Sequence, residues 1–161
     1  MKQEYLQKIF DANKILDDKF CSLYEWEDII NCNKIEVMAE LMELANSSGV
    51  FKYWKKKKGM DYEDALYEYA DWLTMLFFFF HINNTEIHTI EVDDTIGAVD
   101  LVLDLINVYN RFINNNENIL NEMLSKYILL WEKIWFNEDD VLRAALDKIQ
   151  KTMLYLKWEE N

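Results

Sequence analysis

Apolar positions recur at spacings of three and four residues along most of the chain, which is the period of an amphipathic helix. We find no stretch with the apolar and polar alternation of a strand, and no internal repeat. Proline is absent and glycine occurs only three times, so little in the sequence would interrupt long helices. The pattern therefore predicts an all-α fold, a single-domain helical bundle of five to six helices over residues 1–161.

Capping residues and polar breaks indicate where the helices begin and end. The second helix is expected to start after Asn33, where Glu36 completes a capping box, and a loop through Asp28 separates it from the first helix. The third helix is expected to start at Asp61, a good N-cap, with Asp64 at the third helical position. The expected helices are residues 2–19, 34–47, 61–81, 92–113, 119–136 and 138–158.

Composition narrows the range of functions and partners. The net charge is −13 and the sequence pI is about 4.5, so the chain should repel nucleic acid. The apolar run Leu73–Phe80 is much shorter than the roughly 20 residues that span a bilayer, so no membrane partner is expected. Cys21 and Cys32 lack partners at metal-ligand spacing and fit a reduced intracellular protein, which predicts a cytoplasmic location.

Two pairs of acidic residues at helical spacing carry the strongest chemical signal: Glu40-x-x-Glu43 and Glu68-x-x-Asp71. Residues three apart lie on one helix face, so the four carboxylates converge if the two helices pack antiparallel. Such a cluster needs cations, and hard oxygen ligands suit Mg²⁺, which takes further ligands from substrate phosphates. We therefore predict a site for Mg²⁺, with Mn²⁺ able to substitute, in a metal-dependent nucleotide hydrolase.

The alternative interpretation is that these acids face solvent, as acids on helices usually do. The third helix argues against it, because the face that carries Glu68 and Asp71 continues as Met75, Phe78 and Ile82. The other faces of this helix are also apolar, and a helix that is apolar nearly all round is buried. Buried ionised acids need pairing or a metal. The second helix is less decisive, but for the four residues together we favour the metal site.

The residues around these pairs resemble the signature of the all-α nucleoside triphosphate pyrophosphohydrolases, the MazG-like superfamily. Glu40-Leu-Met-Glu-Leu-Ala-Asn46, then Phe51-Lys-Tyr-Trp-Lys-Lys56 and Glu68-Tyr-Ala-Asp71, are most similar to the dimeric dUTPases, especially those of phages. The similarity covers roughly Ile9–Phe80. In the family's late phosphate-binding motif only Lys148 matches well.

This resemblance implies a Mg²⁺-dependent dUTP diphosphatase that hydrolyses dUTP to dUMP and pyrophosphate, and it allows dUDP as a second substrate. It also implies a homodimer. In the family, polar residues of the first helix read the uracil base, which assigns that role to Asn13 and Asp17. One carboxylate must accept a proton from the attacking water, and we assign this catalytic step to Glu40.

Lysines give a second indication of phosphate binding. Lys52 and the run Lys55–Lys58 form the only dense basic segment of a very acidic chain, and a polyanion would need such a segment near its metals. We expect Lys52 and Lys56 to contact phosphate, with Lys148 contributing from the late motif. Trp54 is expected either to stack on the base or to pack in the core.

Two features bear on oligomeric state and on the alternatives. The third helix and the segment Tyr127–Phe136 look apolar on more than one face, which supports the homodimer. Asn13 is shorter than the family's glutamine and the late motif is reduced, so a dCTP-type or MazG-like pyrophosphohydrolase remains an alternative. A non-catalytic helical interaction module is the alternative of another class, and the complete carboxylate set argues against it.

Overall fold

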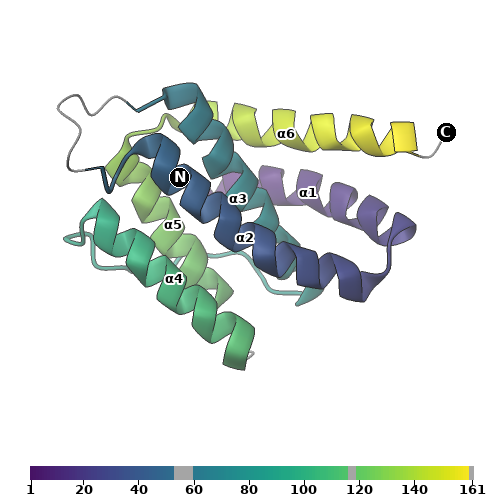
Figure 1. The fold of residues 1–161 in the computed structure, drawn as a ribbon, viewed down its shortest axis with the longest axis horizontal. Helices are drawn as coiled ribbons and strands as arrows, with labels where there is room; N and C mark the ends of the chain where they lie inside the picture. The colour runs from purple at the N-terminus through teal and green to yellow at the C-terminus, as the bar shows by residue number, and fades with distance from the viewer. Residues whose placement is uncertain (53–59, 116–118, 160–161) are drawn as a thin grey trace.

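The computed structural model describes residues 1–52, 60–115 and 119–159. Within these ranges the chain forms six α-helices and no strand (Figure 1), which confirms the expected all-α fold. None of the described helices is long and apolar enough to cross a membrane. The helices are α1 (Gln3–Leu23), α2 (Trp26–Ser48), α3 (Tyr62–Ile82), α4 (Ala98–Asn115), α5 (Leu120–Ile134) and α6 (Glu138–Glu159).

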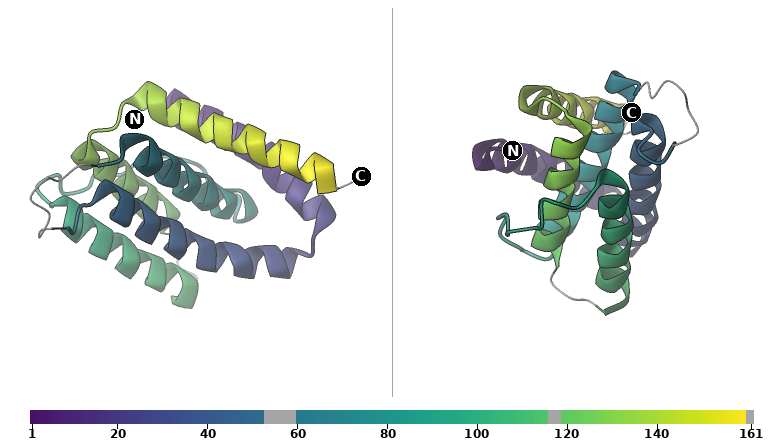
Figure 2. Two further views of the ribbon diagram at one scale, coloured as in Figure 1. Left: turned by 45° about the horizontal axis from the view of Figure 1, so that its top comes forward. Right: turned by 90° about the vertical axis from the view of Figure 1, so that its left-hand side faces the viewer.

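Helix α3 lies at the centre of the bundle and packs against α1, α2, α5 and α6 (Figure 2). As its apolar faces predict, it is buried on nearly all sides, and Trp72, Leu73, Phe77, Phe79 and Phe80 lie in the core. The side chain of Asp61 accepts a hydrogen bond from the Asp64 backbone N–H, so the expected N-cap of α3 is confirmed. The carboxylates of α3 therefore lie on a helix that is held in place by contacts with four other helices.

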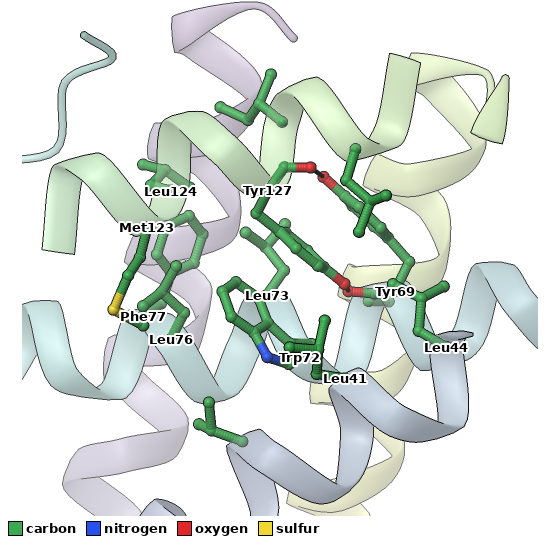
Figure 3. Packing of buried hydrophobic residues seen from close by; sticks show 14 of the residues in the cluster. Leu41, Leu44, Tyr69, Trp72, Leu73, Leu76, Phe77, Met123, Leu124 and Tyr127 are labelled. Carbon is green, nitrogen blue, oxygen red and sulfur yellow. Dashed lines mark hydrogen bonds between the residues drawn. The ribbon is translucent and has the colours of Figure 1, made fainter. Parts of the chain in front are cut away.

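A stack of aromatic rings holds α3 against α5 (Figure 3). The rings of Tyr69 and Tyr127 stack with their centroids 4.1 Å apart, and Trp72 also stacks on Tyr127. Each tyrosine hydroxyl donates to the backbone carbonyl of the other tyrosine, at 3.2 Å from Tyr69 and 2.8 Å from Tyr127. These contacts fix the turn of α3 that carries Glu68 and Asp71.

The prediction that α2 begins after Asn33 is wrong, because the helix begins at Trp26. The polar residues of this stretch suggested a loop, but Ile29 and Ile30 pack against the core and extend the apolar stripe of the helix by two turns. Two acids in the first turn favour a helix N-terminus through the helix dipole. Glu36 is consequently not a capping residue and lies in the middle of α2.

The expected fourth helix also begins later than predicted, at Ala98 instead of Val92. Asp93 accepts hydrogen bonds from both the backbone N–H and the hydroxyl of Thr95, and this local turn competes with helix formation. The carbonyl of Asp94 is held by Lys133. The segment before Gly97 is therefore irregular and is attached to α5.

The segment Tyr127–Phe136, expected to leave apolar surface for a partner, is largely covered by the chain's own helices. Its residues Tyr127, Ile128, Leu129 and Leu130 are buried within one chain. Trp135 is the exception, with 86% of its surface exposed. The apolar faces of α3 and α5 therefore build the core of the single chain.

Candidate active site

The carboxylates of Glu40 on α2 and of Glu68 and Asp71 on α3 come together because the two helices pack side by side and run in opposite directions (Figure 1). One oxygen from each of these three side chains lies within 4.8 Å of the others. Glu43, the fourth expected member, is exposed and its carboxylate lies outside this group. Its charge still acts on the cluster, because it raises the pKa of Glu40, Glu68 and Asp71.

The cluster has two buried oxygens without partners. Asp71 is buried, while Glu40 and Glu68 are partly buried. Among the described residues, Glu40 Oε2 and Asp71 Oδ1 have no hydrogen-bond partner. Because leaving a buried acceptor unsatisfied costs roughly 1–3 kcal/mol, such atoms call for a ligand. Oxygen ligands of this kind are those that Mg²⁺ and Mn²⁺ prefer.

The electrostatics of the cluster favour a bound cation. Burial, followed by the charge of Asp71, raises the pKa of Glu40 to about 8. Burial also raises the pKa of Glu68 and of Asp71, although Lys148 opposes the rise at Asp71. Like charges at such close range disfavour one another, and a cation would reverse this effect. The donor set therefore fits a divalent metal ion.

Lys148 on α6 connects the carboxylates to a neighbouring pocket. Its Nζ donates to Asp71 Oδ2 at 2.5 Å, and its side chain also lines a cavity of about 650 Å³ between α1, α2, α3 and α6. Cavities of this size hold small-molecule ligands. The face of α3 that carries Asp71 continues along this cavity as Met75 and Phe78. The apolar continuation that indicated burial in the sequence is thus the wall of a pocket.

Comparison with known proteins identifies the family. The family model described as dUTPase matches residues 4–153, which is almost the whole chain. The chain belongs to the dUTPase family. It is therefore an enzyme, a nucleoside triphosphate diphosphatase whose substrate is dUTP. No curated protein matches this sequence.

The expected base-reading residues of this dUTPase, Asn13 and Asp17, are both buried on α1 and both line the pocket. Asn13 Nδ2 donates to Asp17 Oδ1 at 3.2 Å, to Asp17 Oδ2 at 3.1 Å and to the carbonyl of Thr74 at 3.1 Å. Burial raises the pKa of Asp17 to about 8, opposed by the hydrogen bond from Asn13. The two side chains act as one hydrogen-bonded unit in the wall of the pocket.

Of the remaining predicted contacts of the dUTPase, only Lys52 and Lys148 lie within the described residues. Lys52 Nζ donates at 2.5 Å to the carbonyl of Asn46, near the C-terminus of α2, and lies over the ring of Phe51. Among the described residues, Lys148 on α6 is the lysine that contacts the carboxylate cluster, through Asp71. Trp54 and Lys56 lie outside the described residues.

Three residues at this site were missed from the sequence. Glu36 was set aside as a helix cap, yet it lines the pocket from the middle of α2. Phe78, which the sequence indicates only as part of the buried apolar face of α3, also forms pocket wall. The sequence indicates no partner for His81, but its ring faces the carboxylates of Asp17 and Asp18 on α1. His81 meets Asp17 and Asp18 because α1 packs against α3, and no local sequence pattern predicts this contact.

Proposed function

We propose that this dUTPase hydrolyses dUTP to dUMP and pyrophosphate with Mg²⁺ held by Glu40, Glu43, Glu68 and Asp71, and that Mn²⁺ can substitute. The observation that carries the proposal is the position of Lys148, which contacts the carboxylate cluster and lines the adjoining pocket. A nucleotide with its base in the pocket would have its phosphates beside both Lys148 and the cluster. Base recognition and phosphate chemistry would then share one continuous site.

Each end of the site suits one part of the substrate. Asn13 and Asp17 supply polar atoms for the base edge, and Leu16, Met75 and Phe78 supply apolar surface for the ring. Lys148 is placed to exchange its bond with Asp71 for a bond with phosphate once cations neutralise the carboxylates. Charge-assisted bonds of this type are among the stronger hydrogen bonds in proteins.

Bound Mg²⁺ would neutralise phosphate charge and lower the pKa of a bound water. The protein's own contribution to water attack is a proton acceptor, and we assign it to Glu40. Burial raises the pKa of its carboxyl group to about 8 in the metal-free protein, and bound cations would lower it, so that Glu40 would be ionised and able to accept a proton. One of its oxygens, Oε2, is buried and has no hydrogen-bond partner among the described residues. Such an oxygen is available to take the proton.

Four further features belong to the same proposal. We expect dUDP to be cleaved as well, because the base and phosphate contacts do not require a third phosphate. Lys52, Trp54 and Lys56 are proposed to reach the phosphates or the base. We also propose a cytoplasmic location, which is supported by the two free cysteines, because they fit a reducing compartment. Similarity to phage dUTPases in the carboxylate segments favours a phage-type enzyme.

A homodimer is also proposed. Several large apolar side chains remain on the surface of the single chain, including Ile35 at 73%, Leu103 at 55% and Trp135 at 86% exposure. Exposed apolar surface of this kind often marks an interface.

The proposal is tested by measuring pyrophosphate release from dUTP, dCTP and dTTP with Mg²⁺ and with EDTA. Chromatography of the products separates one-step release of pyrophosphate from stepwise loss of phosphate. Glu40→Gln should abolish release from dUTP, while Glu63→Gln should not, because Glu63 is an exposed acid on α3 that pairs with Arg143. Equal hydrolysis of dCTP and dUTP by the wild type would replace the dUTP-specific assignment by a broader pyrophosphohydrolase.

A further inference from the structure

His81 lies in the last turn of α3, behind the base-reading residues, and no step described above uses it. Its side chain is 16% exposed. Nδ1 lies 3.4 Å from Asp17 Oδ2, and Nε2 lies 3.5 Å from Asp18 Oδ1. Each ring nitrogen thus faces a different carboxylate of α1. The buried Nδ1 is close enough for an ion pair but makes no hydrogen bond within the described residues.

Asp17 and the Thr74 carbonyl together set the orientation of the Asn13 amide. The amide nitrogen points to three acceptors, which are both oxygens of Asp17 and the carbonyl of Thr74. An amide turned by 180° would place its oxygen against these acceptors, which is unfavourable. The oxygen of Asn13 accepts no hydrogen bond within the part of the chain that the structure describes. Asn13 therefore offers the pocket an acceptor, which suits a base N–H such as N3–H of uracil.

The Asp17 carboxyl group itself is held from two sides. Asn13 contacts it from within α1, and His81 contacts it from α3. Burial raises the pKa of Asp17, and the charge of the neighbouring Asp18 raises it further. The other charged groups that line the pocket are Lys148 on α6, which is bound to Asp71, and the acids at the α2 side of the cavity. His81 is thus the group placed between Asp17 and Asp18 that can hold both carboxyl groups.

We propose that His81 is a positioning residue for base selection: it holds the Asp17 carboxyl group, which in turn keeps the Asn13 amide oxygen turned toward the base. The inference rests on the proposed reading of the base by Asn13. When His81 is lost, Asp17 can rotate toward solvent, and the Thr74 carbonyl alone is left to hold the amide nitrogen. The Asn13 amide then turns more readily and presents its nitrogen to the pocket. An N–H of the base would then meet another N–H, and both donors would be left unpaired.

The kinetic test compares two substitutions at His81 with a matched control. His81→Leu should raise KM for dUTP about tenfold, the cost of roughly one lost hydrogen bond, with kcat changed less than about twofold. The dUTP to dCTP ratio of kcat/KM should fall by a similar factor. His81→Gln keeps an N–H that can reach Asp17 and should restore most of the ratio. His88→Gln changes the other histidine, which contacts Asn121, and should leave both values unaltered.

An unchanged KM and ratio in His81→Leu would overturn the inference, and so would an equal loss of kcat for every nucleotide. A second measurement does not depend on which nucleotide is cleaved. The chain has two histidines, so ring ¹H–¹³C spectra contain two assignable signals. Asp17→Asn should shift the His81 signal and not that of His88. No shift at His81 overturns the inference, whereas a shift in an enzyme that shows no preference for dUTP counts against the proposed function alone.

Discussion

Replacing Asp17 by asparagine is expected to change how the stability of the metal-free protein depends on pH. Asp17 is 5% exposed, and burial raises its pKa from 3.8 to about 8. Between these two values the folded state keeps a proton that the unfolded chain has released. The unfolded state then binds fewer protons, so the free energy of unfolding falls as pH rises from about 4 to about 8. Asparagine resembles the neutral acid and carries no such dependence.

The size of the effect follows from the shift. One pKa unit corresponds to about 1.4 kcal/mol, so a buried acid in this window can cost at most about 1.4 kcal/mol of stability per pH unit. We therefore expect the wild type to lose about 2 kcal/mol relative to Asp17→Asn between about pH 5 and pH 7.

The assay is urea unfolding of both proteins in EDTA at a series of pH values, followed by circular dichroism. Glu40 also has a raised pKa and lowers stability over the same range, but it is present in both proteins and cancels in their difference. A difference between the two proteins that stays constant from about pH 5 to pH 8 would refute the reasoning. It would mean that Asp17 is already ionised in the folded protein.

Three further predictions concern the substrate and the assembly. Lys148→Met should raise KM for dUTP about tenfold or more through loss of a charge-assisted bond to phosphate, and steady-state kinetics showing an unchanged KM would remove Lys148 from the site. Asn13→Ala should reduce the preference for dUTP over dCTP in kcat/KM, and a preference as strong as that of the wild type would exclude Asn13 as the base reader. Light scattering at micromolar concentration should give the mass of a dimer, since large apolar side chains such as Trp135 are exposed on one chain, and a monomer mass would contradict the proposed dimer.

The fold could be predicted because local patterns determine most of it. Gly49 adopts the left-handed conformation that ends α2, and Asp61 caps α3, so both boundaries were visible in the sequence. The start of α2 could not be seen, because Glu25 makes no side-chain cap and the evidence for helix lies in tertiary packing of Ile29 and Ile30. Boundaries that depend on contacts with distant segments leave little local trace.

Part of the candidate site could likewise be predicted from local patterns, and part could not. The pairing of Glu68 with Asp71 and their place on a buried helix follow from helical periodicity, which is a local property. Contacts between helices do not, and three of them complete the site: Lys148 with Asp71, His81 with Asp17, and Asn13 with the Thr74 carbonyl. Each joins residues at least 61 positions apart.

The most direct test of the account is calorimetric titration of Mg²⁺ into the metal-free protein. Asp71→Asn and Glu68→Gln each remove one carboxylate from the cluster on α3, and Glu63→Gln removes an exposed acid from the same helix as the control. The account predicts that the first two variants lose at least about tenfold in Mg²⁺ affinity, while the control binds as the wild type does. Wild-type affinity in both cluster variants would contradict the claim that these carboxylates hold the metal.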